Sequence, residues 1–140
     1  MTATIFDQII NDHFMYEATD DVDAVMGSLT DDAEHHVVPS PVGVLTDRQQ
    51  IRAYYEMLFA SVRGESVTPV RRLYGDDFVV DEVIWNGHIT DGRAFLCDGR
   101  SGDVSFRLLH VFEIRDGLIC RENVWCDLAA IQQQLGCVAG

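Results

Sequence analysis

The sequence has few basic residues and no long apolar run. Lysine and arginine together number 10, against 23 aspartates and glutamates, so the formal net charge is −13. A surface of this charge repels phosphate backbones and anionic membranes. No stretch approaches the ~20 apolar residues that a membrane span needs, and the N-terminus MTATIFDQIIND has no basic region. We therefore expect a cytoplasmic protein that binds neither nucleic acid nor membrane.

Several motifs that carry chemistry are also missing. The four cysteines lie apart and form no CxxC pair: Cys97, Cys120, Cys126 and Cys137. We expect reduced thiols and no zinc site. The patterns GxGxxG, GxxxxGK[ST], GxSxG and HExxH are absent, which argues against nucleotide binding, a serine-hydrolase elbow and a zincin site. The five histidines are dispersed, with no spacing that requires a metal. The sequence predicts no metal and no cofactor.

The apolar content is sufficient for a core: hydrophobic residues make up 47% of 140 residues, and we expect a single domain spanning 1–140. Apolar spacing predicts helices over 4–18, 21–29 and 46–62, the last capped by Thr46 with Gln49. A short strand is expected within 33–39, and strand-like segments follow at 66–74, 77–89, 93–98, 104–115 and 118–127, before a closing helix over 128–135. This order predicts an α+β fold, an antiparallel sheet with helices on one face and a hollow between the layers.

The clearest candidate for a functional side chain lies on segment 104–115. Side chains alternate between the two faces of a strand. One face holds Val104, Phe106, Leu108, His110, Phe112 and Ile114. A buried polar group needs a partner, and imidazole titrates near neutral pH. His110 is therefore either a general acid or base in a pocket, or a core histidine bonded to a carbonyl group or a buried water.

The other histidines are weaker candidates. His35 and His36 face opposite sides of an extended segment, so they do not chelate one metal side by side. Alternation hardly separates them, and we place His36 inward because it shares its face with Val38. His88 lies in the turn-like stretch WNGHITDG, where a histidine is more often solvated than catalytic. His13 lies on the apolar face of the first predicted helix and is interpreted as a packing residue.

The segment 118–127 offers polar candidates on both of its faces. One face carries Ile119, Arg121, Asn123, Trp125 and Asp127, and the other carries Cys120, Glu122, Val124 and Cys126. Asp127 precedes LAAIQQQL and suits an N-cap, which competes with a role in a pocket. Glu122 and Asp127 are the nearby carboxylates for holding a water between them, and their opposite parity argues against that arrangement.

Two stretches of the chain resemble a known family. YEATDDVDAVMGSLTDDAEHHVVPSPVGVLTDRQQIRAYYEMLF is similar to the opening of SnoaL-like proteins of the nuclear transport factor 2-like (NTF2-like) superfamily, and VFEIRDGLICRENVWCDLAAIQQQLG is similar to their closing hairpin and helix. The resemblance implies a cone-shaped α+β barrel, with a curved antiparallel sheet wrapped over three N-terminal helices. It also implies a deep apolar pocket, cofactor-free activity and, commonly, a homodimer formed through the outer sheet face.

The resemblance extends to individual positions. Catalytic positions of dehydratase-like relatives match His35 or His36, Tyr54 or Tyr55, His88, His110 and Asn123. A histidine stands on the first strand where these relatives have an aspartate. The cyclase pattern HWD on the last strand reads ENVWCD here, with the position of its aspartate at Val124. No complete known set of catalytic residues is therefore present.

We hypothesise a cofactor-independent lyase or isomerase, dehydratase- or cyclase-like, acting on a small apolar, oxygenated or polyketide-like substrate. The expected catalytic residues are His36, His88 and His110, working by general acid–base chemistry. The expected substrate contacts are Tyr16, Tyr54, Trp85, Asn123, Trp125 and Asp127, with a tyrosine or Asn123 donating a hydrogen bond to an enolate oxygen. The alternatives are a non-catalytic ligand-binding or dimerisation module, and an epoxide hydrolase.

Overall fold

The structure is a computed structural model that describes residues 2–137. Its helices are α1 (Thr2–Ala18), α2 (Val22–Gly27), α3 (Arg48–Ser61) and α4 (Leu128–Gln134), with a 3₁₀ turn η1 (Arg93–Phe95). Its strands are β1 (Leu29–Val38), β2 (Val44–Leu45), β3 (Val62–Tyr74), β4 (Phe78–Ile89), β5 (Gly102–Arg115) and β6 (Leu118–Cys126). The predicted α+β architecture, with three helices before the main strands, is confirmed.

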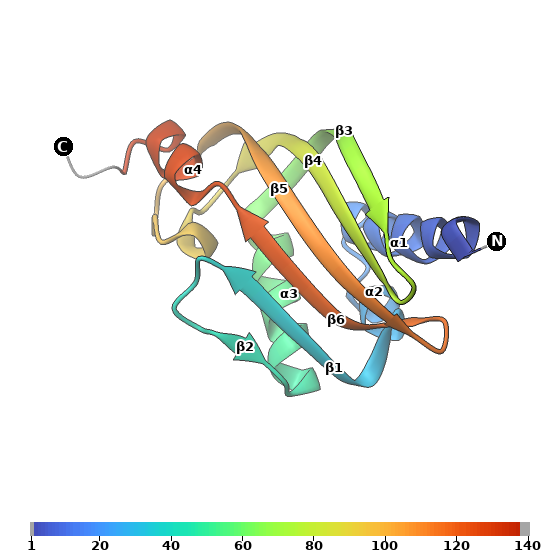
Figure 1. Cartoon of the computed structure of the whole chain (residues 1–140). Helices are drawn as coiled ribbons and strands as arrows, with labels where there is room; N and C mark the ends of the chain where they lie inside the picture. The colour runs from blue at the N-terminus through green and yellow to red at the C-terminus, as the bar shows by residue number, and fades with distance from the viewer. Residues whose placement is uncertain (1, 138–140) are drawn as a thin grey trace.

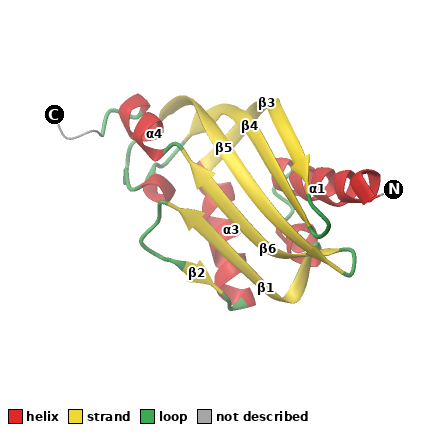
Figure 2. Ribbon diagram, in the orientation of Figure 1, coloured by secondary structure: helices red, strands yellow, loops and turns green. Residues whose placement is uncertain are grey.

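The strands form one curved, open sheet with the order β2-β1-β6-β5-β4-β3. Helices α1, α2 and α3 lie together on one side of the sheet, and α4 lies at its end (Figures 1 and 2). The long strands β3 to β6 pair as antiparallel neighbours, but β1 pairs with β6 in parallel. The parallel pairing was not anticipated, because it joins segments far apart in the sequence. It places His35 beside Glu122.

Aspartates begin three of the helices. Side-chain oxygens of Asp21, Asp47 and Asp127 accept hydrogen bonds from backbone amides in the first turns of α2, α3 and α4. These bonds satisfy amides that have no partner within the helix. The cap of α3 is thus Asp47, and the predicted cap at Thr46 is wrong. The N-cap reading of Asp127 is the one that the structure supports.

The predicted strand over 93–98 is also wrong, because a local side chain holds this segment as a tight turn. Asp91 Oδ1 accepts hydrogen bonds from the amides of Arg93, at 3.1 Å, and Gly99, at 3.0 Å. A side chain that bonds nearby amides competes with a strand ladder for them. The segment forms η1 instead, and Phe95 within it is buried.

Two facing glycines make room for an indole ring. Gly64 on β3 pairs with Gly87 on β4. A Cβ atom added at Gly87 would overlap the carbonyl oxygen of Arg63 and the ring of Trp85, and one at Gly64 would lie 3.5 Å from that ring. Residues without a Cβ therefore allow the Trp85 side chain to lie against the backbone here.

Two apolar clusters fill the space between the sheet and the helices. One joins α1, α2 and α3 to the sheet and includes Ile10, Ile51 and Phe112. The other lies under η1 and α4 and includes Phe95 and Phe106. The inward alternation predicted for β5 is confirmed, since His110 is 4% exposed among buried neighbours on its face.

The prediction of reduced thiols is not confirmed for one pair of cysteines. A disulfide joins Cys97 and Cys137, whose Cα atoms lie 6.0 Å apart, because α4 returns the end of the described chain to η1. Cys120 and Cys126 are free. Between residues 2 and 137, none of the helices combines the length and apolarity that crossing a bilayer requires.

Candidate active site

A buried glutamate lies at the centre of the candidate site. Glu122 is 2% exposed and lies on β6, which runs between β1 and β5 in the sheet. It points toward the helices, as do Val124 and Cys126 on the same face, which line the same cavity. The Tyr55 hydroxyl from α3 donates a hydrogen bond to Glu122 Oε1. A carboxylate this far from water needs such partners, because burial strongly disfavours an uncompensated charge.

Three histidines from three different elements surround this carboxylate. The Nε2 atom of His13, on α1, lies 3.2 Å from Glu122 Oε1. The Nε2 atom of His35, on β1, lies 3.8 Å from the same oxygen. The Nε2 atom of His110, on β5, lies 3.5 Å from Glu122 Oε2. One carboxylate therefore has an imidazole near each of its two oxygens and a third imidazole on the side of α1.

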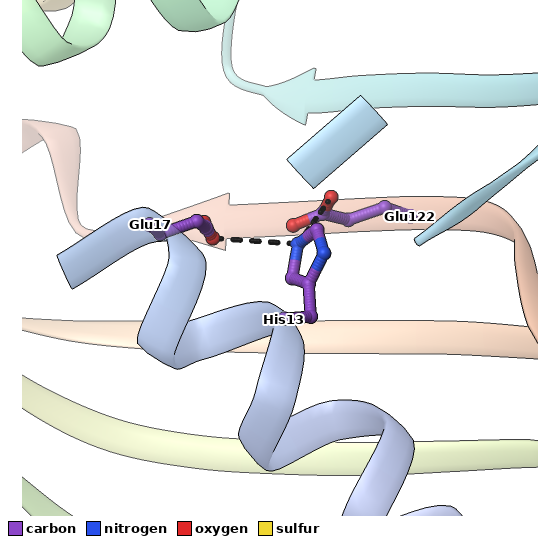
Figure 3. Close-up of side chains that lie close together, drawn as sticks. All are labelled: His13, Glu17 and Glu122. Atoms are coloured by element: carbon purple, nitrogen blue, oxygen red, sulfur yellow. Dashed lines mark ion pairs between the residues drawn. The ribbon is translucent and has the colours of Figure 1, made fainter. Parts of the chain in front are cut away.

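The hydrogen bond and the ion pairs of His13 determine its charge. Its Nδ1 lies 2.8 Å from Ser28 Oγ, and the Ser28 hydroxyl donates its one hydrogen to the carbonyl oxygen of Val25. Ser28 Oγ can therefore only accept, so Nδ1 carries a proton. Nε2 faces Glu122 and, at 3.4 Å, Glu17 Oε2 (Figure 3). An imidazole between two carboxylates is stabilised with protons on both nitrogens, as an imidazolium ion.

The charges of this cluster shift the pKa values of its members. Burial alone would lower the pKa of His13, but the carboxylates of Glu122 and Glu17 raise it to about 10. Burial alone would raise the pKa of Glu122, but the surrounding histidines, His13 foremost, hold it well below the usual range. Glu122 is thus ionised and His13 is protonated at neutral pH.

His35, Tyr54 and Tyr55 are neutral at pH 7. Burial lowers the pKa of His35 below 6.5, and the attraction of Glu122 offsets only part of this effect. Burial raises the pKa of both Tyr54 and Tyr55, so both keep their phenolic protons. The site therefore combines a neutral imidazole, a proton-donating phenol at Tyr54 and a fixed carboxylate, the groups that general acid–base chemistry uses.

A cavity of about 550 Å³ opens beside Glu122, between the two apolar clusters. Its walls are mainly apolar and aromatic: Phe14, Tyr54, Leu58, Phe59, Val83, Trp85, Phe95, Phe106 and Leu108. His35, His110, Tyr55 and Glu122 also line it. A largely apolar cavity with a few convergent polar groups is typical of a site for a small organic ligand.

The structure brings some of the predicted site residues to this cavity. Tyr54, Trp85 and His110 line it. The inward placement of His36 is wrong: His35 lies inside, because β1 pairs in parallel with β6 and sets His35 against Glu122 and His36 against Asn123. His35 is 3% exposed, beside a buried Ala33 on its own face.

The other predicted site residues lie away from the cavity. His88 is on the opposite face of β4, where its Nδ1 lies 2.8 Å from Asp103 Oδ1. Asn123 accepts a hydrogen bond from Arg121 at 2.7 Å on the outer face of β6. Trp125, on that same outer face, is 39% exposed. Asp127 caps α4, and Tyr16 packs against the apolar cluster below α1. Alternation along the strands and the helix cap account for these positions.

Sequence reasoning missed the central residues of the site. Glu122 was weighed only as a partner of Asp127, although it shares its face with apolar Val124 and half-buried Cys126. His13 was interpreted as a packing residue, yet Glu17 follows it one helical turn later, a spacing that pairs side chains. The sequence did not decide whether Tyr54 or Tyr55 occupies the tyrosine position of the dehydratase-like relatives. The signal available in the sequence was a glutamate on the inward face of a predicted strand.

His13, Glu17 and Glu122 are also the residues with the donor atoms for a metal ion. One donor atom from each lies within 4.8 Å of the others, in the part of the chain that the structure describes. The hydrogen bond from Nδ1 to Ser28 would leave Nε2 free to coordinate if His13 lost its second proton. Glu17 and Glu122 already form ion pairs with His13 without a metal.

Comparison with known proteins gives the family. A family model for the SnoaL-like domain matches residues 10–122. The chain therefore belongs to the SnoaL-like family, as the resemblance predicted. No curated protein matches the sequence.

Several solved structures share the fold. A protein of ketosteroid isomerase-like fold from Catenulispora acidiphila, solved in complex with trimethylamine, is 18% identical over 91% of this chain and 92% of its own, with a TM-score of 0.73. A proposed polyketide cyclase from Xanthomonas campestris is 18% identical over 94% and 97%, with a TM-score of 0.76. An epoxide hydrolase from M. tuberculosis is 19% identical over 94% and 90%, with a TM-score of 0.71. At these identities the likeness establishes the fold alone.

Proposed function

We propose that this protein is a cofactor-independent lyase or isomerase that moves protons on a small, mainly apolar carbonyl compound. The observation that carries the proposal is the ionised Glu122, with His35 near one oxygen and His110 near the other, at the wall of a 550 Å³ cavity. The membership of the SnoaL-like family and the polyketide cyclase neighbour are consistent with this class of activity.

His35 is the proposed base. Its lowered pKa keeps the imidazole neutral and able to accept a proton at pH 7. When the imidazole becomes an imidazolium, the Glu122 carboxylate next to it stabilises the new charge and holds the ring in place. His35 thus replaces His36 in the original hypothesis, with His110 kept as the second imidazole of the site.

The proton transfer balances without a further reactant. His35 takes the proton from the carbon next to the carbonyl, and the electron pair of that C–H bond forms the enolate. The phenol of Tyr54, whose ring centroid lies 5.0 Å from that of His35, donates a hydrogen bond to the enolate oxygen. The imidazolium then returns the proton to another carbon, which completes an isomerisation, or to a β-hydroxyl group that leaves as water.

Turnover in D₂O tests this proposal. We would follow deuterium incorporation and product formation by ¹H NMR for a panel of β-hydroxy ketones and β,γ-unsaturated ketones, with amino ketones included because one neighbour holds trimethylamine. His35→Asn should lower the rate of a substrate ~10²-fold or more, the usual contribution of a general base. His36→Asn and His88→Asn are matched controls on the outer sheet face and should leave it unchanged. An His35→Asn protein with the parent rate would refute the assignment.

One observation favours a non-catalytic ligand-binding module as a second candidate. Glu122 is already matched by the His13 imidazolium at 3.2 Å, so its buried charge is compensated without any reaction. Tight binding of apolar ligands without deuterium incorporation or turnover would favour this candidate. The epoxide hydrolase alternative loses its proposed carboxylate pair, because Asp127 caps α4.

Three expectations about the protein's surroundings stay predictions. They are the homodimer, which light scattering in solution would test, the cytoplasmic location, and the apolar, oxygenated substrate.

A further inference from the structure

The ionisable groups that line the cavity are mostly of one sign. Glu17, Asp20, Glu65 and Glu122 belong to its lining, whereas no arginine does among residues 2–137, and the sequence has no lysine. Arg63 is adjacent to the lining residues Val62 and Gly64 in the chain, but it is exposed and is not part of the lining. A cavity with low-dielectric walls and charges of one sign attracts ligands of the opposite sign.

The one buried cation of the cluster lies behind the carboxylates. The His13 imidazolium contacts both Glu122 and Glu17, which line the cavity, but His13 itself does not line it. Two carboxylates share this one positive charge, which leaves one negative charge uncompensated on the cavity side. His35, the neutral base of the proposed function, and His110 line the cavity beside Glu122.

The guanidinium of Arg72, which contacts the lining residue Asn11, does not reverse this balance. Arg72 lies within 3.1 Å of Asn11, which lines the cavity, but it is bound to Asp7 at 2.8 Å and Asp81 at 2.7 Å. These two carboxylates exceed its single charge. The C-terminal turn of α1 also borders the cavity through Met15 and Ala18. The end of a 17-residue helix carries a partial negative charge of roughly half an elementary charge.

Aromatic rings form much of the remaining wall. The rings are those of Phe14, Tyr54, Tyr55, Phe59, Trp85, Phe95 and Phe106. The face of an aromatic ring attracts a cation, and clusters of such faces recognise quaternary ammonium groups. Trp85 offers the most favourable ring, and the facing glycines Gly64 and Gly87 hold it against the sheet.

We propose that the cavity binds ligands carrying a tertiary or quaternary ammonium group on a small apolar body, and that it disfavours carboxylates. The ammonium group is attracted by Glu17 and by the exposed carboxylates of Asp20 and Glu65, while the aromatic walls contact its methyl groups. That such a ligand is also the substrate rests on the proposed function; the binding preference does not.

Three soluble ligands of similar shape and different charge test this inference. They are choline, its uncharged isostere 3,3-dimethylbutan-1-ol, and the anion 3,3-dimethylbutanoate. We would titrate each into ¹⁵N-labelled protein at pH 7 and follow the amide signals of the cavity residues by NMR. Choline should bind ~10-fold more tightly than the alcohol, from cation–π and charge attraction together, and the anion should bind most weakly.

Two charge-removing variants localise the effect. Glu17→Gln keeps the shape of a side chain that is 21% exposed, and should lower the affinity for choline several-fold without changing that for the alcohol. Glu113→Gln removes one carboxylate from the outer sheet face and should leave the affinities for choline and for the alcohol unchanged. Trp85→Leu should lower the affinity for choline more than the affinity for the alcohol.

Equal affinities of choline and the alcohol for the wild-type protein would overturn the inference. So would a loss of choline preference in Glu113→Gln equal to that in Glu17→Gln, because the effect would then come from overall charge. Failure of the proposed function looks different: choline would bind preferentially, while no ketone of the turnover panel, with or without an amine, would react.

Discussion

Replacing Glu122 by glutamine removes the central charge of the site with little change in shape. In the wild-type protein this carboxylate pairs with the His13 imidazolium at 3.2 Å, and both side chains are almost completely buried. Removing one partner of a buried ion pair typically costs ~3–5 kcal/mol of stability, because the other charge is left uncompensated. Glu17, 3.4 Å from His13, retains part of the attraction. We therefore expect a loss near 3 kcal/mol at pH 6.

The pH dependence distinguishes the lost ion pair from a packing defect. The pKa of His13 is raised from 6.5 to about 10 on folding, so its stabilising contribution is complete below pH 6.5 and is lost as the pH rises toward 10. The pKa of Glu122 is lowered from 4.5, so its contribution is complete above about pH 4.5 and is lost in acid. The destabilisation by Glu122→Gln should be greatest between about pH 5 and 6.5 and should shrink toward pH 10.

Urea unfolding at pH 6, 8 and 9.5 measures this difference. The rise in the pKa of His13 from 6.5 to about 10 corresponds to at most ~5 kcal/mol, of which Glu17 retains a part in the variant. Glu34→Gln is a matched control, since Glu34 is 44% exposed and pairs with Arg121 at the surface. It should cost less than ~1 kcal/mol. A loss for Glu122→Gln that is the same at all three pH values would refute the reasoning.

Three further predictions follow from the same geometry. Tyr55→Phe removes the hydrogen bond to Glu122 and should cost ~1.5–3 kcal/mol in urea unfolding, with an unchanged stability contradicting a buried charged bond. Asp127→Ala removes the cap of α4 and should cost ~1 kcal/mol without affecting turnover; lost turnover would return Asp127 to the site. The turnover rate should decline only below pH 6.5, as His35 becomes protonated, and a decline already complete at pH 7 would argue against His35 as the base.

Much of the fold could be predicted because its signals are local. Helical spacing located α1, α2 and α3 to within a few residues, and alternation on β5 placed His110 inside. The short turn η1 was mistaken for a strand because its apolar residues resemble one, whereas the bonds of Asp91 that hold it depend on the folded loop.

The centre of the site depends on contacts between distant segments. The choice between His35 and His36 is made by the parallel pairing of β1 with β6, which alternation within one short strand does not reveal. His13 and Glu122 are 109 positions apart in the chain, and they meet only because α1 packs across the sheet. The family resemblance pointed to His88 and Asn123, which lie on the outer face of the sheet.

The most direct test of the site is a titration of the imidazole ¹⁵N signals of the histidines, free and with a ketone from the turnover panel. We predict that His13 stays doubly protonated through pH 8.5, as its raised pKa requires, while His35 is neutral at pH 7. His35 and His110 should both respond to the same ligand, and His36 and His88 should not. If His13 and His35 both titrated near pH 6.5 and no ligand moved the signals of His35 and His110 together, the buried charge cluster and the active site built on it would be contradicted.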